Sequence, residues 1–540
     1  MTGTSRFQWL PLGVLASAQA LLVFNIATLK ISIEGIVTAF DTSSGTVKTA
    51  IIMYSLVVAA SVLASTRLAI LVGARRIFRI SLALFGAAMA VMAWSPNAGV
   101  LVGAQMAAGA AAAVLTPASV QLIANHYSGE HRAIALGRLS AIRSLSLAPA
   151  FLIAGAIDTW IDWRITFTLL LLLATVIYVC SSFLRQDRGL LLRPITATEW
   201  TGLAAVALAL LLIGLGSDNL TNWGVFRAKP EAPFSPLDLS PALLGMVFGT
   251  ALIKLVLVWL RRRHVGGWLG AMQLLNTPEQ RSMLLSIFTI AAVSSAVTFL
   301  IPLYIEIVQG RSSLHTAYAL VPFTVASFVG ALLVGRFSSS PVIRNATRLA
   351  FIAVGMGLVW LGAIVRNDWS DASVVLSLAL VGLGEGALAT MLFKALAAAA
   401  PMEVSADVEP LCSATSHFAA AVGAALAGAM VIGVLSLNVN QHLARNPAID
   451  SELRAHLDLN RVAFISNDRL QQALENSPLT PEHIANVVQI NTDARLFALK
   501  LSFFALAGLT FVGLLPLVRV RTDTSRRRRS HRASVPAEPR

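Results

Sequence analysis

The feature that most limits what this chain can fold into is its series of long apolar segments. Fourteen mainly apolar runs follow one another from about residue 9 to about residue 518. A helix of roughly 20 residues, rising 1.5 Å per residue, crosses a hydrocarbon layer of roughly 30 Å. Only 13% of the 540 residues are charged, against about 25% in soluble proteins. The sequence therefore predicts an all-α polytopic membrane protein with 14 transmembrane helices.

Basic residues are unevenly distributed between the two sets of connecting segments. With the N-terminus placed in the cytoplasm, the segments on that side carry sixteen arginines before the basic tail. The opposite segments carry seven basic residues, namely Lys30, Lys48, Arg164, Arg227, Lys229, Arg311 and Arg366. Basic residues favour the cytoplasmic side of membrane proteins. We therefore expect a multi-pass protein of the plasma (inner) membrane with both termini in the cytoplasm.

Missing motifs disfavour several classes of function. The chain has no Gly-x-x-x-x-Gly-Lys-Ser/Thr loop, so we expect no direct drive by ATP. Its two cysteines and the lack of metal-ligand spacing predict no metal and no cofactor. A net charge of +14 would suit a nucleic-acid binder, but a hydrophobic content of 56% argues against that partner. Movement of a solute across the membrane remains, and an enzyme is the weakest alternative.

Two polar segments lie outside the apolar runs. Residues 437–495 are predicted to form an extracytoplasmic loop, with a helix-start signal at Thr480, Pro481 and Glu482. This loop is either a cap without chemistry or an element that hands over lipid-like molecules. Residues 521–540 are predicted to form a basic disordered cytoplasmic tail, whose arginines would contact anionic lipids.

Five short motifs follow one another in order along the chain. They are TAIIMYSL at 49–56, LAILVGARR at 68–76, AAGAAAAVLTPAS at 107–119, DWRITF at 162–167, and PLYIEIVQG at 302–310. Together they resemble the major facilitator superfamily and, within it, the fourteen-helix drug:proton antiporter family, of which the chain would be a divergent member. The resemblance implies two six-helix bundles that rock about a central cavity.

The resemblance also implies a division of the chain. It predicts an N-terminal bundle at 1–190, an inserted transmembrane helix pair at 191–265, and a C-terminal bundle at 266–520 that includes the 437–495 loop. The cytoplasmic gate would contain Arg67, Gly73, Arg75, Arg76 and Pro149.

Some family positions are altered. Ile70 stands where the loop signature has an aspartate, and Gln105 stands where the fourth helix has an arginine. Ala148 and Pro149, followed by Gly155, are a reduced form of the antiporter element in the fifth helix.

Ionisable residues inside apolar runs cost at least about 2.5–3.5 kcal/mol, so they usually face a cavity or a partner. Glu385, in the sequence GLGEG, is the leading candidate for proton coupling, and a structural ion pair with a lysine such as Lys254 is the alternative. Glu306 and His417 are further candidates for proton coupling. For Glu306 the alternative is snorkelling or pairing at the membrane interface, and for His417 it is a hydrogen-bonded packing role.

Three polar residues are candidates for the substrate cavity. Arg143 would bind an anionic group or replace a lost ion pair. Asn25 and Gln105 would line the cavity, with hydrogen bonding between helices as the alternative for each.

These patterns predict a secondary transporter that exports hydrophobic or amphiphilic compounds in a proton-coupled, multidrug-type process. Its partners would be a small amphiphilic substrate and protons, and it would be a monomer or weak dimer. Two alternatives stay open: an exporter of lipid-like amphiphiles that uses the 437–495 loop, and a transport-deficient scaffold or sensor.

Overall fold

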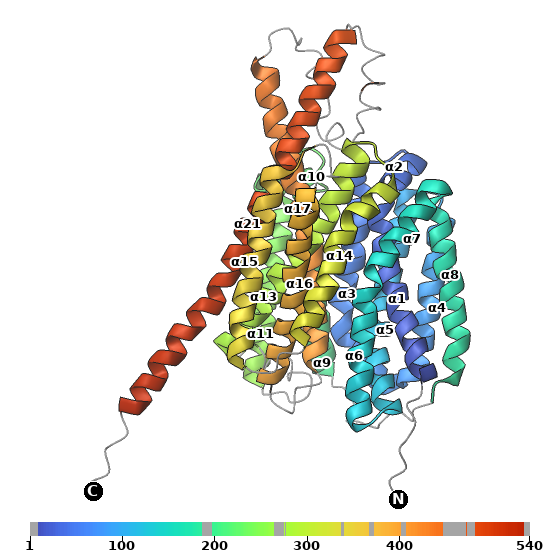
Figure 1. The fold of residues 1–540 in the computed structure, drawn as a ribbon, viewed down its shortest axis with the longest axis vertical. Helices are drawn as coiled ribbons and strands as arrows, with labels where there is room; N and C mark the ends of the chain where they lie inside the picture. Colours follow the sequence, from blue (N-terminus) through green and yellow to red (C-terminus); the bar gives the residue numbers. More distant parts are fainter. Residues whose placement is uncertain are drawn as a thin grey trace, which may run out of the picture.

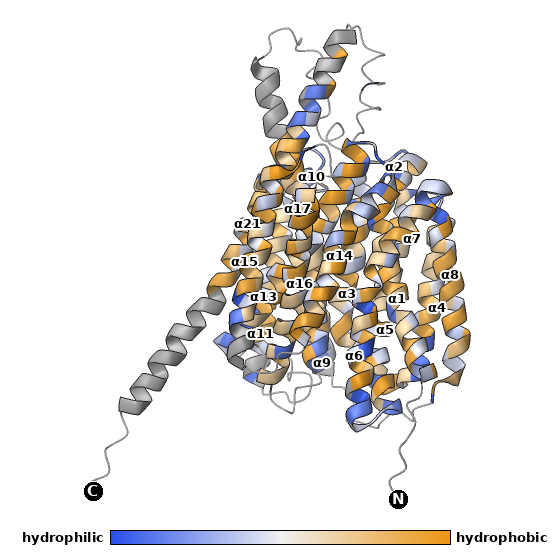
Figure 2. Ribbon diagram, in the orientation of Figure 1, coloured by the Kyte–Doolittle hydropathy of each residue, from blue (hydrophilic) through white to orange (hydrophobic). Residues whose placement is uncertain are grey.

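The computed structural model describes residues 9–185, 197–263, 275, 277–335, 340–366, 372–400, 407–445, 471 and 481–533. Among these residues, 14 helical segments are long and apolar enough to cross a membrane, and no β-strand is present. The predicted all-α architecture with its fourteen spans is confirmed. Apolar residues dominate the middle of the bundle, and polar residues gather toward its two ends (Figure 2).

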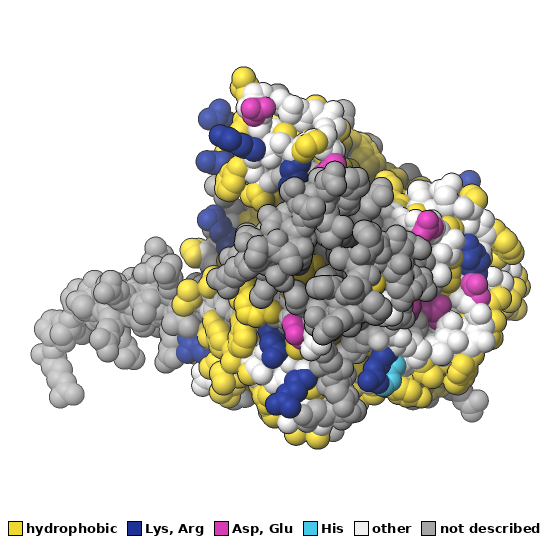
Figure 3. Space-filling view, turned by 90° about the horizontal axis from the view of Figure 1, so that it is seen from above, with side chains coloured by type: hydrophobic (Ala, Val, Ile, Leu, Met, Phe, Trp, Pro, Cys, Tyr) yellow, Lys and Arg dark blue, Asp and Glu magenta, His cyan; other side chains and the backbone are white. Residues whose placement is uncertain are grey.

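The helices run between two end faces of the molecule (Figure 1). Helix α1 (Trp9–Ile31) begins at one end, and α21 (Pro481–Ala533) finishes toward the same end. We call this end the terminal face. The opposite end carries α2 (Ile33–Phe40) and is called the distal face. From the distal face, hydrophobic side chains are seen along much of the outer rim (Figure 3).

The first group of helices consists of α1 to α8. After α1 and α2 come α3 (Ser44–Val72), α4 (Ala74–Ala93), α5 (Ala98–His126), α6 (Gly129–Leu145), α7 (Leu147–Trp160) and α8 (Trp163–Cys180). Helix α5 packs against both α3 and α4, and α4 packs against α8. A short 3-10 turn, Ser181–Phe183, ends the group at the terminal face.

The fifth span is built from two helices rather than one. Helix α6 ends at Leu145 and α7 begins at Leu147, with Ser146 between them. Pro149 explains the break, because it has no N–H to donate to the Leu145 carbonyl and its ring would collide with that carbonyl. The span therefore covers Gly129–Trp160 and is longer than the run at 136–157 that the sequence indicates.

The second group of helices begins with α13 (Pro278–Pro302), which continues as a π-helical turn, η3 (Leu303–Val308). It continues with α14 (Ser313–Gly335), α15 (Ser340–Ile364), α16 (Ala372–Ala399), α17 (Val408–Arg445) and α21. Helix α16 packs against α14 and α15, and α13 packs against α17 and α21. Helix α21 starts at Pro481, as the helix-start signal predicts.

Two glycines bring α16 against α14. A Cβ atom at Gly382 would lie 2.1 Å from the Phe323 carbonyl oxygen, and one at Gly386 would lie 1.8 Å from that of Ser327. Only glycine permits this approach, which in lipid gives the van der Waals contact that holds helices together. Glu385 is therefore carried into a tight helix contact.

The C-terminal tail differs from its prediction. The sequence predicts disorder from residue 521, whereas α21 continues as helix to Ala533. The physical reason is that the tail has no helix breaker before Pro536, and arginine has a high helix propensity. Most of the 437–495 loop lies outside the described residues. The predicted boundaries near residues 190 and 265 also lie there, so the domain division stays a prediction.

The inserted helices are α9 (Ala197–Asp218), α10 (Leu220–Trp223) and α11 (Pro241–Arg263), with a 3-10 turn at Pro236–Asp238. Helices α9 and α11 pack against each other. Helix α9 also packs against α3 of the first group and α17 of the second. The inserted pair therefore lies against the boundary of the two groups.

A buried ion pair fixes α9 to the first group. Lys48 and Asp218 are 4% and 3% exposed, and the Lys48 Nζ lies 3.0 Å from the Asp218 Oδ1. Thr49 Oγ1 donates to Asp218 Oδ2 at 2.8 Å. Gly428 on α17 leaves space for the lysine stem, since a Cβ there would lie 2.8 Å from its Cδ. Lys48 is therefore a buried helical residue, although the sequence analysis counts it with the loops.

We expect Lys48→Met or Asp218→Asn to destabilise the protein by about 3–5 kcal/mol, because either change leaves one buried charge without its partner. The measurement is thermal unfolding of the purified protein in detergent. Lys229→Met is the matched control: Lys229 is exposed and its Nζ donates to a backbone carbonyl, so a change within about 0.5 kcal/mol is expected. Equal effects at Lys48 and Lys229 would contradict the assignment.

Candidate functional site: charged residues between the two helix groups

The two helix groups meet mainly along two pairs of helices. Helix α3 packs against α17, and α7 packs against α14. Charged side chains occur at this boundary near the distal face, in the interior and near the terminal face. They are the residues whose surroundings must change if the groups move relative to each other.

In the interior, Lys30 of the first group faces Glu385 of the second. The Lys30 Nζ donates a hydrogen bond of 2.7 Å to Thr298 Oγ1 on α13. The Glu385 carboxylate accepts hydrogen bonds from Ser327 on α14 and Ser294 on α13. The two opposite charges interact electrostatically across the boundary. Helices α1, α13, α14 and α16 thus meet at one polar cluster.

A buried charge needs a counter-charge and hydrogen bonds, and this cluster supplies both. Lys30 is only 8% exposed, so its charge is almost fully removed from solvent. From the sequence, Lys30 is predicted to lie in a loop, and a lysine such as Lys254 is the alternative partner of Glu385. In the structure Lys254 lies on an exposed face of α11, and Lys30 is the lysine that interacts with Glu385.

A second electrostatic contact crosses the boundary at Arg143. Its side chain is exposed at the end of α6, yet its charge interacts with Glu409 and His417 on α17 and with Tyr54 on α3. Arg143 therefore lies at the boundary of the two groups, within the electrostatic range of Glu409.

Asn25 and Gln105, the other predicted cavity residues, are fully buried. The Asn25 Nδ2 donates to Gln105 Oε1 at 3.2 Å, and the Gln105 Nε2 donates to Asn25 Oδ1 at 3.1 Å. This reciprocal pair joins α1 to α5 within the first group. The structure thus gives these amides the hydrogen bonding between helices that the sequence analysis holds as the alternative.

Near the distal face, carboxylates join the two groups through hydrogen bonds. Glu306, which is buried in the π-helical turn, accepts a hydrogen bond of 3.2 Å from the backbone N–H of Glu34. Asp158 accepts a hydrogen bond from Ser313. A Cβ at Gly155 would lie 2.8 Å from the Ser313 carbonyl oxygen, so α7 and α14 touch here. The groups are closed against each other at this end.

Near the terminal face, Arg67 on α3 forms a salt bridge with Asp407, just before α17. The Arg67 Nη2 lies 3.3 Å from Asp407 Oδ1. Burial raises the pKa of Asp407 above its ordinary value, while the charge of Arg67 acts in the opposite direction. Protonation of Asp407 would remove the charge that Arg67 pairs with.

The remaining predicted gate residues lie on the first group. Gly73 joins α3 to α4 with a φ of 93°, a value that strongly favours glycine. Arg75 donates a hydrogen bond of 2.7 Å from Nη2 to the Ser182 carbonyl, and Arg76 is exposed. Pro149 lies in the first turn of α7. Gly73, Arg75 and Arg76 line one pocket, whose lining includes neither Arg67 nor Pro149.

Sequence reasoning missed four charged residues of the boundary, which are Lys30, Asp158, Asp407 and Glu409. Lys30 lies at the end of an apolar run, and its burial depends on helices that are distant in sequence. Asp407 and Glu409 lie at the start of an apolar run, where acidic residues also favour a helix N-terminus. An acidic residue beside such a run was the available signal, but it has a common structural explanation.

We expect Lys30→Met and Glu385→Gln to be coupled, because each removes the counter-charge of the other. The double variant should be more stable than the sum of the single effects predicts, by about 0.5–3 kcal/mol. Thermal unfolding of the four proteins in detergent measures this energy. In the control cycle, Lys254→Met with Glu385→Gln, the effects should add within about 0.5 kcal/mol. Additive effects in both cycles would contradict the pairing.

We expect Asp407→Asn to loosen the contact of α3 with α17 at the terminal face. A single cysteine at the buried position 408, in a chain without Cys180 and Cys412, should then react several-fold faster with a maleimide. Burial raises the pKa of Asp407, so acidification should protonate this residue in the protein without the Asp407→Asn change. The ratio of the two maleimide reaction rates, with and without Asp407→Asn, should then approach one. Asp238→Asn, at a distal loop, is the control. A ratio that does not change with pH would contradict the role of the salt bridge.

Comparisons with known proteins agree with this architecture. The family model described as Major Facilitator Superfamily matches residues 15–428. A solved structure of a bacterial homolog of the human lysosomal transporter Spinster, inward-facing and unoccupied, aligns over 96% of this chain and 99% of its own. The TM-score is 0.57 at 13% sequence identity. This likeness concerns the fold.

Three relatives extend over most of the chain. The multidrug efflux pump LfrA of Mycolicibacterium smegmatis is 24% identical over 81% of this chain and 84% of its own. The probable actinorhodin transporter of Streptomyces coelicolor is 21% identical over 89% and 84%. The multidrug resistance protein Stp of Mycobacterium tuberculosis (strain CDC 1551 / Oshkosh) is 24% identical over 84% and 81%. With the family model matched from residue 15 to residue 428, the chain belongs to the Major Facilitator Superfamily of membrane transporters.

Proposed function

We propose that this transporter exports hydrophobic or amphiphilic compounds in exchange for protons. Two relatives named as multidrug efflux or resistance proteins support the type of substrate. The excess of arginines in the segments at the terminal face supports a cytoplasmic location of that face in the plasma membrane. In this orientation, export moves the substrate from the terminal to the distal side.

The observation that carries the proposal is the electrostatic interaction of Glu385 with Lys30 across the boundary of the groups. Glu385 is held by Ser327 and Ser294 within its own group, whereas the opposite charge belongs to the other group. A carboxylate attracts Lys30, and a neutral carboxylic acid does not. Binding of a proton at Glu385 therefore changes the attraction between the groups.

This charge change supplies a means of coupling. With Glu385 ionised, the pair stabilises the arrangement in which α1 lies against α13 and α14. With Glu385 protonated, that stabilisation is lost, and separation of the groups no longer leaves an unpaired carboxylate in an apolar region. The proton gradient would thus bias the populations of the two arrangements.

Other residues would assist at the two ends. Glu306 and His417 are proposed as further proton-binding groups, and Arg143 with Glu409 as the charged wall that a substrate meets. Asn25 and Gln105 would fix the positions of α1 and α5 beside the cavity through their reciprocal hydrogen bonds. Arg67, with Asp407, would close the terminal side, together with Gly73, Arg75, Arg76 and Pro149.

The test is transport in proteoliposomes with an imposed pH gradient and a panel of cationic, neutral and anionic amphiphilic dyes. Glu385→Gln should bring proton-driven transport close to the level of protein-free liposomes, while dye binding in detergent persists. Glu279→Gln is the matched control, since Glu279 is an exposed carboxylate in the first turn of α13. It should transport like the wild type.

Two outcomes would contradict the proposal. If Glu385→Gln retained full pH-dependent transport, the coupling group would lie elsewhere. If no dye produced proton flux in the wild-type protein, drug:proton exchange would be wrong.

A further inference from the structure

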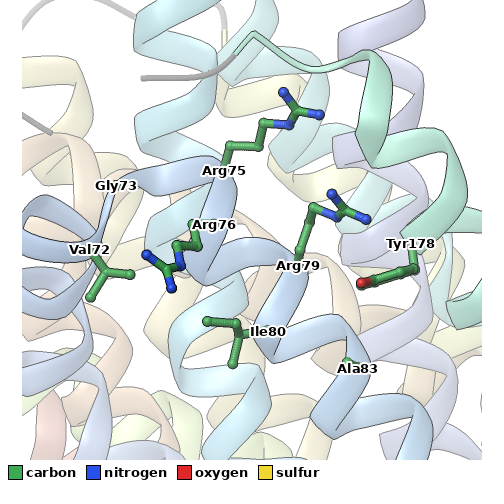
Figure 4. A pocket seen from close by; sticks show the side chains of 8 residues that line it. All are labelled: Val72, Gly73, Arg75, Arg76, Arg79, Ile80, Ala83 and Tyr178. Carbon is green, nitrogen blue, oxygen red and sulfur yellow. The ribbon is translucent and has the colours of Figure 1, made fainter. Parts of the chain in front are cut away.

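A pocket of about 530 Å³ opens on the first group at the terminal face, away from the boundary of the two groups. Three arginines in the first turns of α4 line it, namely Arg75, Arg76 and Arg79 (Figure 4). Val72 at the end of α3 and Tyr178 near the end of α8 contribute further walls. The function proposed above uses Gly73, Arg75 and Arg76 of this lining to close the terminal side and assigns the pocket no ligand.

The arginines have no acidic partner in the helices that form the pocket. Helices α3, α4 and α8 contain no Asp or Glu, and neither of the salt bridges found among the described residues includes an arginine of α4. The Arg79 Nε is buried and has no hydrogen-bond partner in the described part of the chain. Three positive charges and a free donor therefore surround a space to which the described parts of α3, α4 and α8 bring no counter-charge.

The arginines are also held in position. The Arg75 Nη2 donates to the Ser182 carbonyl at 2.7 Å. The Arg79 guanidinium lies over the ring of Tyr178, with its Cζ 4.6 Å from the ring centroid, and Figure 4 shows it turned toward that ring. This stacking leaves the edge of the guanidinium for hydrogen bonds, which suits a phosphate group. The N-terminus of α4 adds its own positive potential.

Apolar side chains adjoin the basic pocket on the outer surface of the bundle. Ile80 of the pocket is 51% exposed, and Val179, next to Tyr178, is 61% exposed. Both belong to helices that cross the membrane. A ligand seated here would meet arginines with its head and a lipid-facing apolar surface with the rest of its body.

We propose that this pocket binds the phosphate headgroup of an anionic phospholipid, with the acyl chains along α4 and α8. Arg76 and Arg79 contact the phosphate, and Arg75 orients the end of α8. The apolar wall distinguishes this occupant from a soluble phosphate compound, which would gain nothing from Ile80 and Val179. The site is independent of the proton coupling at Glu385.

The test uses the full-length protein in a neutral detergent and measures lipid binding by native mass spectrometry. The probes are phosphatidylglycerol, phosphatidylcholine and, as the soluble arm, glycerol 3-phosphate. Wild type should bind phosphatidylglycerol well above phosphatidylcholine. The variant Arg76→Gln with Arg79→Gln should bind it on the order of tenfold more weakly, since each arginine near a lipid headgroup contributes a severalfold factor.

The matched control is Arg132→Gln, at an exposed arginine of the same face on α6. The affinity of this variant for phosphatidylglycerol should stay within about twofold of that of the wild type. Arg79→Lys keeps the charge, so its affinity should fall between those of wild type and the double variant. Thermal unfolding of each variant verifies that it is folded. An equal loss at Arg132 would overturn the proposal in favour of diffuse surface charge. Equal affinity for glycerol 3-phosphate, or for phosphatidylcholine, would also overturn it.

Discussion

A charged side chain placed inside a lipid-surrounded helix bundle needs an opposite charge and hydrogen bonds, and this requirement organises the boundary between the two helix groups. Lys30 meets it with Thr298 and the charge of Glu385, both in the other group. Neither group alone would satisfy its buried charge. The polar cluster therefore depends on the groups lying together, and any separation must be accompanied by neutralisation or by water.

The inserted helices add a second constraint. Helix α9 packs against α3 and α17, so it lies where the two groups touch. It is ion-paired to the first group through Lys48 and Asp218, and among the described residues no salt bridge joins it to α17. Relative motion of the groups would then leave α9 with the first group and slide it along α17, where the contact consists of packed side chains.

The spans were predictable because a helix that crosses lipid must satisfy its backbone hydrogen bonds internally and present apolar side chains over about 20 residues. Both properties are local, and all fourteen segments appear in the structure. The break at Ser146 is also a local effect, since Pro149 cannot donate a backbone hydrogen bond. Glu385 could be singled out because a carboxylate in the middle of an apolar run is costly wherever the helix packs.

By itself, the sequence determined the number of spans, the helical class and which charges would lie in unusual surroundings, because these follow from residues close together in the chain. Only the tertiary structure decided the partners. Glu385 interacts with Lys30, which is 355 residues away, and Arg143 with Glu409. Such pairings depend on which helices become neighbours, and that depends on side-chain packing and on close approaches such as those at Gly382 and Gly386. Apolar periodicity cannot distinguish one neighbour from another, since every helix of the bundle presents a similar apolar surface to its surroundings.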